Sequence, residues 1–111
     1  TVINIKPGRV GGYLEGKAIH DYCFANKIDV WCGGMLETGI GRAANVALAA
    51  LDGFTLPGDT SASNRYYKRD LTEPFVMKDG QLEVPSGPGI GVAIDEDFLN
   101  SIAVKREEVR L

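Results

Sequence analysis

The sequence contains few of the residues that build disulfide frameworks or metal clusters. It has two cysteines, Cys23 and Cys32, and one histidine, His20, in 111 residues. Neither cysteine belongs to a Cys-x-x-Cys pair, and no group of His and Cys residues surrounds them. The sequence therefore indicates neither a disulfide scaffold nor a structural zinc site. We expect two reduced thiols that pack as small apolar groups, as in cytosolic proteins.

Long apolar runs and an excess of one charge are also missing. No apolar run reaches the roughly 18 residues that a membrane span needs. The 12 Lys and Arg residues are spread along the chain, and the net charge is only -3. Neither a membrane partner nor a nucleic-acid partner is therefore indicated. A composition that is 44% hydrophobic and 24% charged is typical of a soluble globular protein, and we expect a cytoplasmic one.

Short β-branched runs alternate with helical stretches in the first half of the chain. The pattern predicts strands at residues 2–5, 30–32 and 54–56, and helices over residues 12–26 and 41–51. This β-α-β-α-β order is typical of a parallel sheet, whose ligands bind at the carboxyl ends of the strands. The expected places for chemistry are the loops that follow the strands: residues 6–12, 33–41 and 58–64.

The two predicted helices differ in their apolar surfaces. The second is apolar nearly all round, so we expect it to be well buried and to be stopped by Asp52-Gly53. In the first helix, apolar residues recur at spacings of three and four and predict a single buried face. The residues of that face are Leu14, Ala18, Tyr22 and Ala25.

The second half of the chain has a different pattern. Residues 75–84 predict a hairpin with a turn at Asp79-Gly80. A Pro- and Gly-rich loop over residues 85–91 follows, and Asp95 is a candidate cap for a short helix over residues 97–103. Three parallel strands cannot close a barrel, and a parallel sheet needs both edges covered. We therefore expect the chain, which begins with Thr1 rather than Met, to be part of a longer protein.

Four motifs carry a resemblance to a known family. The motifs are INIKPGRVGG (3–12), VWCGGMLETG (30–39), LPGDTSAS (56–63) and PSGPGIGV (85–92). They resemble, in this order, the sixth, seventh and eighth barrel strands and the chain return to the cap of the o-succinylbenzoate synthase / N-acylamino acid racemase family of the enolase superfamily. Because the four motifs occur in the same order and span nearly the whole chain, together they identify the family much more specifically than any one motif does.

The resemblance implies an α/β fold, the C-terminal part of a modified TIM barrel of the (β/α)7β type. Residues 1–70 would supply its last three strands with their helices. Residues 71–111 would form a C-terminal hairpin and helix associated with the α+β capping domain. The expected partners are the remainder of the barrel and the cap, a small carboxylate substrate, and further copies of the chain in a homo-oligomer.

The resemblance also implies a reaction. Members of the family abstract a proton α to a carboxylate and then lose water, which yields o-succinylbenzoate for menaquinone biosynthesis, or return the proton to an N-acylamino acid as racemases. A divalent metal, Mg²⁺ or Mn²⁺, assists, and its ligands are expected upstream, with none in this chain. One alternative is another acid-sugar or dipeptide member of the superfamily. A second is a non-catalytic fragment that acts only as a structural part of the barrel.

Lys6 is the candidate catalytic residue. It directly precedes Pro7-Gly8 at the end of the first predicted strand, where a lysine is either a solvated strand end or a base at the site. The resemblance assigns it the proton donor or acceptor role in racemisation, and charge stabilisation of an enediolate in the dehydration. Arg9 is a candidate to tune Lys6 or to bind a carboxylate, with a solvated surface arginine as its alternative.

The second loop supplies the candidate substrate contacts. Gly33 and Gly34 would let a ligand approach the backbone, and Met35 would form an adaptable apolar wall, although a plain turn with Met35 in the core is also compatible. Glu37 and Thr38 are candidates for supporting hydrogen bonds. For Asp59 we expect a turn-stabilising carboxylate rather than a metal ligand. For His20 we expect a solvent-facing or helix-packing side chain.

Magnesium binding by the separate chain tests the metal expectation. Because the ligand carboxylates are expected upstream, calorimetric titration of the 111-residue chain with MgCl₂ should show only weak, non-saturating binding. A tight one-to-one isotherm would mean that the metal ligands lie in this chain.

Overall fold

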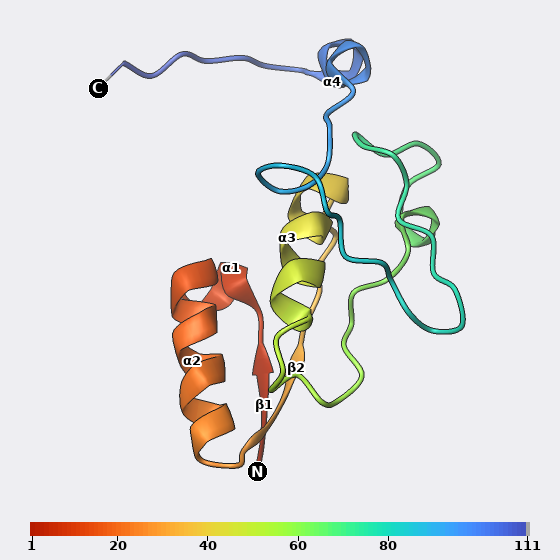
Figure 1. Ribbon diagram of the computed structural model, residues 1–111. Helices are drawn as coiled ribbons and strands as arrows, with labels where there is room; N and C mark the ends of the chain where they lie inside the picture. The colour runs from red at the N-terminus through yellow and green to blue at the C-terminus, as the bar shows by residue number, and fades with distance from the viewer. Residues whose placement is uncertain (111) are drawn as a thin grey trace.

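Two parallel strands lie at the centre of the N-terminal half (Figure 1). In the computed structural model, which describes residues 1–110, β1 (Val2–Ile5) pairs with β2 (Asp29–Cys32). The register places Val2 opposite Asp29 and Ile5 opposite Cys32. The chain crosses between the strands through a single turn, α1 (Pro7–Val10), and the longer α2 (Tyr13–Ala25). The predicted parallel β-α-β unit is therefore confirmed, and α1 is an addition to it.

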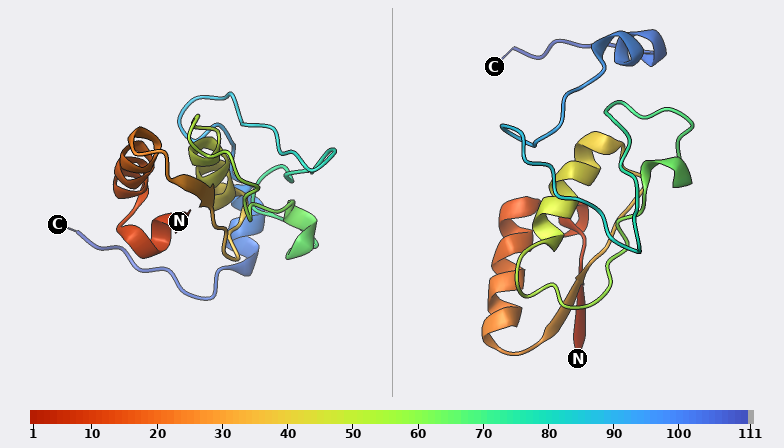
Figure 2. Two further views of the ribbon diagram at one scale, coloured as in Figure 1. Left: turned by 90° about the horizontal axis from the view of Figure 1, so that it is seen from below. Right: turned by 45° about the vertical axis from the view of Figure 1, so that its right-hand side comes forward.

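The helices pack on one face of the sheet. Ile5, Val30 and Cys32 are almost completely buried, and they form one apolar cluster with Cys23 of α2 and Leu48 of α3 (Gly39–Ala49). The two cysteines are free thiols inside this cluster, as predicted. Figure 2 shows both helices on the same side of the strands. The opposite face of the sheet carries the alternate side chains of each strand.

The third predicted strand is wrong, because residues 54–56 form no strand. Parallel pairing occurs later, as a single bridge between Gly33 and Asp59 in which the Asp59 amide donates to the Cys32 carbonyl at 2.8 Å. Phe54 instead packs against the apolar cluster. Pro57 lacks an N–H and cannot donate to β2, so pairing is confined to the residues after it.

The predicted apolar face of α2 is also wrong. Leu14 is 89% exposed and Tyr22 is 67% exposed, whereas the buried residues are Gly16, His20 and Cys23. Gly16 allows this orientation, since a Cβ there would lie 3.4 Å from the Ile5 side chain. The helix therefore approaches the sheet over a small residue, and larger apolar side chains at a similar spacing face outwards.

His20 is the helix-packing histidine of the two predicted alternatives. Its ring stacks on Phe54 at a centroid distance of 5.0 Å. Its Nε2 accepts a hydrogen bond from the Gly53 amide at 3.0 Å, and its Nδ1 lies 2.9 Å from the Asp21 carboxylate. This pattern requires a neutral ring with its proton on Nδ1, pointing towards Asp21.

The predicted second helix exists but is displaced towards the N-terminus. α3 ends at Ala49, with Ala50 as its cap. The prediction that Asp52-Gly53 stops this helix is therefore wrong. At the other end, the buried Asp70 carboxylate accepts the Gly39 amide at 2.7 Å, which lets the helix begin before Gly41. As predicted, most of α3 is buried.

The second half of the chain contains little regular structure. It includes a 3-10 turn, η1 (Ser63–Arg65), and one helix, α4 (Glu96–Ile102). The predicted Asp95 cap of this helix is confirmed, since its carboxylate accepts the Phe98 amide at 2.9 Å. Figures 1 and 2 show α4 and residues 103–110 lying apart from the sheet.

The predicted hairpin forms only its turn. Lys78 and Gln81 exchange two backbone hydrogen bonds of 2.9 Å, and Asp79 and Gly80 both have positive φ, as the Asp-Gly turn requires. The flanking strands do not form beyond this bridge. Val76 is 62% exposed, whereas Phe75 and Leu82 belong to an apolar cluster with Ala43 and Val46 of α3. The division into residues 1–70 and 71–111 stays a prediction.

Among residues 1–110, no helix has both the length and the apolar character needed to cross a bilayer.

Gly53→Ala tests the contact that fixes α2. A Cβ on Gly53 would lie 2.5 Å from His20 Nε2, so the variant must displace the ring or lose the amide hydrogen bond. We expect it to lower the free energy of unfolding by about 1–3 kcal/mol in chemical denaturation. Gly8→Ala is the matched control, because a Cβ there meets no atom within 4 Å. Equal stability of the two variants would contradict this role of Gly53.

Candidate functional site

The Lys6 side chain extends from the end of β1 across the end of β2. It is the residue before Pro7, its side chain is partly buried, and its Nζ lies 3.8 Å from the Met35 sulfur. A Cβ on Gly33 would lie 2.6 Å from Lys6 Cε and 2.7 Å from Lys6 Cγ. Gly33 therefore provides the room through which the lysine side chain passes, and the two loops meet at this point.

Asn4 belongs to the same face and was missed in the sequence. A Cβ on Gly33 would also clash with Asn4 Oδ1, which places Asn4 beside Lys6. Asn4 is paired with Trp31 of β2, and neither residue belongs to the buried apolar core. The period of two along a strand, counted back from Lys6, is the signal that identifies Asn4.

Gly34 has a different reason for being glycine. Its φ is not positive, and an added Cβ would overlap the backbone carbonyl oxygen of Asp59. The close approach at this position is therefore made by the chain itself. The Asp59 side chain is exposed, and the residue contributes its backbone to the pairing with β2.

Glu37 is the centre of a hydrogen-bond network. Its Oε1 accepts from the Met35 amide at 2.7 Å and from Asn45 Nδ2 at 3.0 Å. Asn45 Oδ1 in turn accepts from the Tyr13 hydroxyl at 2.9 Å. The network joins the loop after β2 to α3 and to the start of α2. Neither Asn45 nor Tyr13 was identified from the sequence, since both lie in helical patterns outside the motif loops.

These side chains line one cavity of about 390 Å³. It brings together four of the six predicted site residues: Lys6, Gly33, Met35 and Glu37. Arg9 lies outside it, with an exposed side chain and an amide that donates to the Lys6 carbonyl at 2.8 Å. The cavity lies at the low end of the range of about 300–1,000 Å³ that is usual for small-molecule pockets.

Arg42 is a buried cation that the sequence pattern did not reveal. It is 1% exposed and lies in α3 between alanine and glycine. Its Nη2 donates to the Glu37 carbonyl at 2.8 Å, and its Nη1 donates to the Ser61 carbonyl. Arg42 thus ties the loop after β2 to the segment that follows Asp59.

The charge of Glu37 acts on two neighbouring groups. Burial, and then the Glu37 carboxylate, raise the pKa of the Cys32 thiol from 9.0 to about 11. The same two causes, in the same order, raise the pKa of the Tyr13 hydroxyl. Both groups are therefore neutral at physiological pH, and Tyr13 remains a hydrogen-bond donor to Asn45.

The described residues do not form a metal site. In residues 1–110, no three His, Cys, Asp or Glu side chains gather closely enough to hold an ion. The Lys6 ammonium donates to the Met35 sulfur, which is not a carboxylate. The residues present at this site therefore do not fit a divalent metal.

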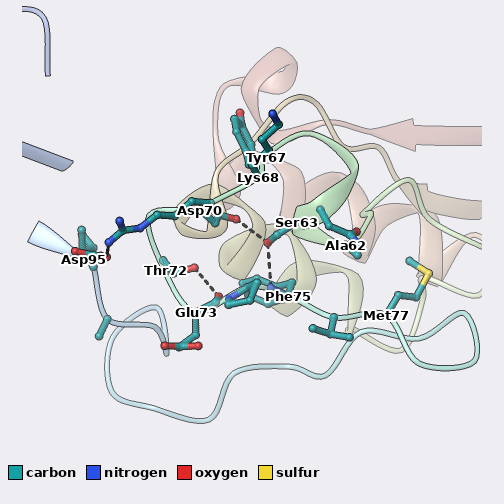
Figure 3. A pocket seen from close by; sticks show the side chains of 16 residues that line it. Ala62, Ser63, Tyr67, Lys68, Asp70, Thr72, Glu73, Phe75, Met77 and Asp95 are labelled. Carbon is teal, nitrogen blue, oxygen red and sulfur yellow. Dashed lines mark hydrogen bonds and ion pairs between the residues drawn. The ribbon is translucent and has the colours of Figure 1, made fainter. Parts of the chain in front are cut away.

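A larger cavity, of about 800 Å³, lies in the second half (Figure 3). Its floor is a structural hydrogen-bond centre in which Ser63 Oγ donates to Asp70 at 2.6 Å and accepts the Phe75 amide at 3.0 Å. Asp70 also anchors the start of α3. Ser63 and Asp70 are therefore engaged in holding the chain together at this cavity.

Comparison with known proteins relates most of the chain to one family. The model of the family "Enolase C-terminal domain-like" matches residues 1–98. An N-succinylamino acid racemase from Amycolatopsis sp is 63% identical over 95% of this chain. An o-succinylbenzoate synthase from Bacillus subtilis is 50% identical over 96% of it. The chain covers 28% and 29% of these two relatives.

Solved structures agree with the sequence comparison. An enolase-superfamily member from Listeria innocua matches 90% of this chain with a TM-score of 0.86 and 50% identity. A muconate lactonizing enzyme from Klebsiella pneumoniae matches 92% with a TM-score of 0.81 and 26% identity. This chain covers 27% and 29% of these structures. The structural similarity over nearly all of the chain confirms the predicted α/β fold as part of an enolase-superfamily protein.

The raised pKa of Cys32 predicts a stability change at high pH. The thiol of the unfolded chain ionises at lower pH than the folded one, so ionisation favours unfolding. Its contribution is complete below about pH 9 and is lost as the pH rises to about 11, at about 1.4 kcal/mol per pH unit. Denaturant titrations of the wild type and Cys32→Ala at several pH values measure it. Parallel pH profiles of the two proteins would contradict the prediction.

Proposed function

The chain belongs to the enolase C-terminal domain-like family, and on this basis we propose that it forms the C-terminal part of an o-succinylbenzoate synthase. The observation that carries the proposal is Lys6, which extends across Gly33 from a strand end into a cavity and has the Met35 sulfur beside its ammonium group. The 50% identity to the Bacillus subtilis synthase over 96% of this chain supports it.

The proposed reaction begins with removal of a proton α to a carboxylate, followed by loss of water. Negative charge develops on the carboxylate oxygens as the proton leaves. The Lys6 ammonium, held on a strand end, stabilises that charge without having to reorganise. Met35 and Gly33 form one wall of the site, and Glu37 supports that wall through the Met35 amide.

Racemisation of N-succinylamino acids is a second candidate, and the 63% identity to the Amycolatopsis racemase favours it. Here Lys6 would exchange a proton with one face of the α-carbon. A second base, outside this chain, would serve the opposite face. The same lysine position supports both reactions, because each needs a protonatable amine beside the α-carbon.

The proposal assigns the rest of the machinery to segments outside residues 1–111. A divalent cation, Mg²⁺ or Mn²⁺, would be held there and would polarise the substrate carboxylate when bound. Further barrel strands would pair with the open edge of β1, which has β2 as its only strand neighbour in the described part of the chain. We further propose a homo-oligomeric cytoplasmic enzyme with an α+β cap over the site, and Arg9 as a residue that tunes Lys6.

Lys6→Ala in the full-length enzyme tests the assignment. We expect turnover of the synthase substrate to fall by roughly 10²–10⁴, with a melting temperature close to that of the wild type, because Lys6 is only partly buried. Lys17→Ala is the control, since Lys17 is an exposed helix lysine that pairs only with Asp21. Near-normal turnover by Lys6→Ala would sink the proposal.

A further inference from the structure

The Glu37 side chain supports the loop after β2 through hydrogen bonds. One carboxylate oxygen, Oε1, accepts both the Met35 amide and Asn45 Nδ2. The backbone carbonyl of the same residue accepts Arg42 Nη2 at 2.8 Å. Glu37 is thus fixed at both its side chain and its main chain, and the Met35 backbone is fixed through it.

The support is anchored in the interior. Asn45 is 3% exposed, and its side chain bridges Glu37 to the Tyr13 hydroxyl. Tyr13 begins α2, directly after the loop that follows Lys6. The network therefore spans the loops after both strands and fixes the distance between them.

Met35 connects this support to Lys6. Its sulfur lies 3.8 Å from Lys6 Nζ, while the residue is 49% exposed. A methionine side chain is flexible, so the backbone position of Met35 sets the point from which its sulfur reaches Lys6. The Glu37 Oε1 accepts the Met35 amide at 2.7 Å, and this hydrogen bond holds that backbone.

We propose that Glu37, anchored by Asn45 and Tyr13, is a positioning residue that sets the place of the Lys6 ammonium through Met35. The inference rests on the proposed function, in which Lys6 stabilises the developing charge in the synthase reaction and, in the racemase candidate, serves one face of the α-carbon. Glu37 itself neither gains nor loses the substrate proton. Its carboxylate oxygen acts as an acceptor, so a carboxamide of the same shape can replace it.

Deuterium exchange at the α-carbon separates positioning of Lys6 from general damage. In D₂O, Lys6 takes the α-proton of one enantiomer of an N-succinylamino acid, exchanges it with solvent, and returns a deuteron to the same carbon. The opposite enantiomer exchanges through the base outside this chain. The enantiomer served by Lys6 is the one whose exchange Lys6→Ala abolishes. Exchange of both enantiomers by Lys6→Ala would refute the role of Lys6 in the racemase candidate, whereas the turnover of Lys6→Ala tests the synthase.

Glu37→Ala and Glu37→Gln in the full-length enzyme then test the inference. We expect Glu37→Ala to slow exchange of the Lys6-dependent enantiomer by about tenfold or more, with the other enantiomer within about threefold of wild type. Glu37→Gln keeps the acceptor oxygen and should keep both rates within about threefold. Glu15→Ala, an exposed acidic position on α2, is the control.

Three results would overturn the inference: equal slowing of both enantiomers by Glu37→Ala, no slowing of either, or a loss in Glu37→Gln as large as in Glu37→Ala. If the wild type exchanges neither enantiomer, the same variants are compared in the synthase reaction. There the inference requires kcat to fall about tenfold in Glu37→Ala with KM within about threefold, and to be rescued in Glu37→Gln. Any other pattern contradicts it.

Discussion

The arrangement of the site depends on the absence of one side chain, at Gly33. Parallel pairing of β1 and β2 brings their carboxyl ends together, so Lys6 and the residue after Cys32 compete for one volume. Because position 33 has no Cβ, both Asn4 and the aliphatic part of Lys6 fit across the end of β2. The contact of the Lys6 ammonium with Met35 lies just beyond this crossing.

Three buried polar side chains replace regular structure where the sheet ends. Arg42 joins two strand-end loops, Asp70 holds the start of α3 and Ser63, and Asn45 joins Glu37 to Tyr13. Each of them is less than 9% exposed. Hydrogen bonds of this kind fix irregular backbone that lacks a ladder of its own, and removing one partner leaves the others unsatisfied.

The sequence predicted the elements whose pattern is local. The strands at Val2–Ile5 and Asp29–Cys32, the Asp95 cap and the Asp79-Gly80 turn depend on neighbouring residues alone, and all four are present. Lys6, Gly33, Met35 and Glu37, which line one cavity, were predicted because they follow strand ends or belong to motifs. The prediction of the buried face of α2 was wrong because Gly16 packs through its small size and His20 through a tertiary hydrogen bond. Hydrophobicity does not encode either property.

The outward apolar side chains of α2 and the open edge of β1 have a consequence for handling the separate chain. Leu14 and Tyr22 of the helix, like Val2 of the strand, are more than half exposed. An unpaired parallel strand beside bare apolar surface is a template for pairing with identical copies. Recovery of the chain from bacterial expression will therefore depend on its concentration and on chaperone supply, and co-expression with the complementary segment is the direct route to material that stays dispersed.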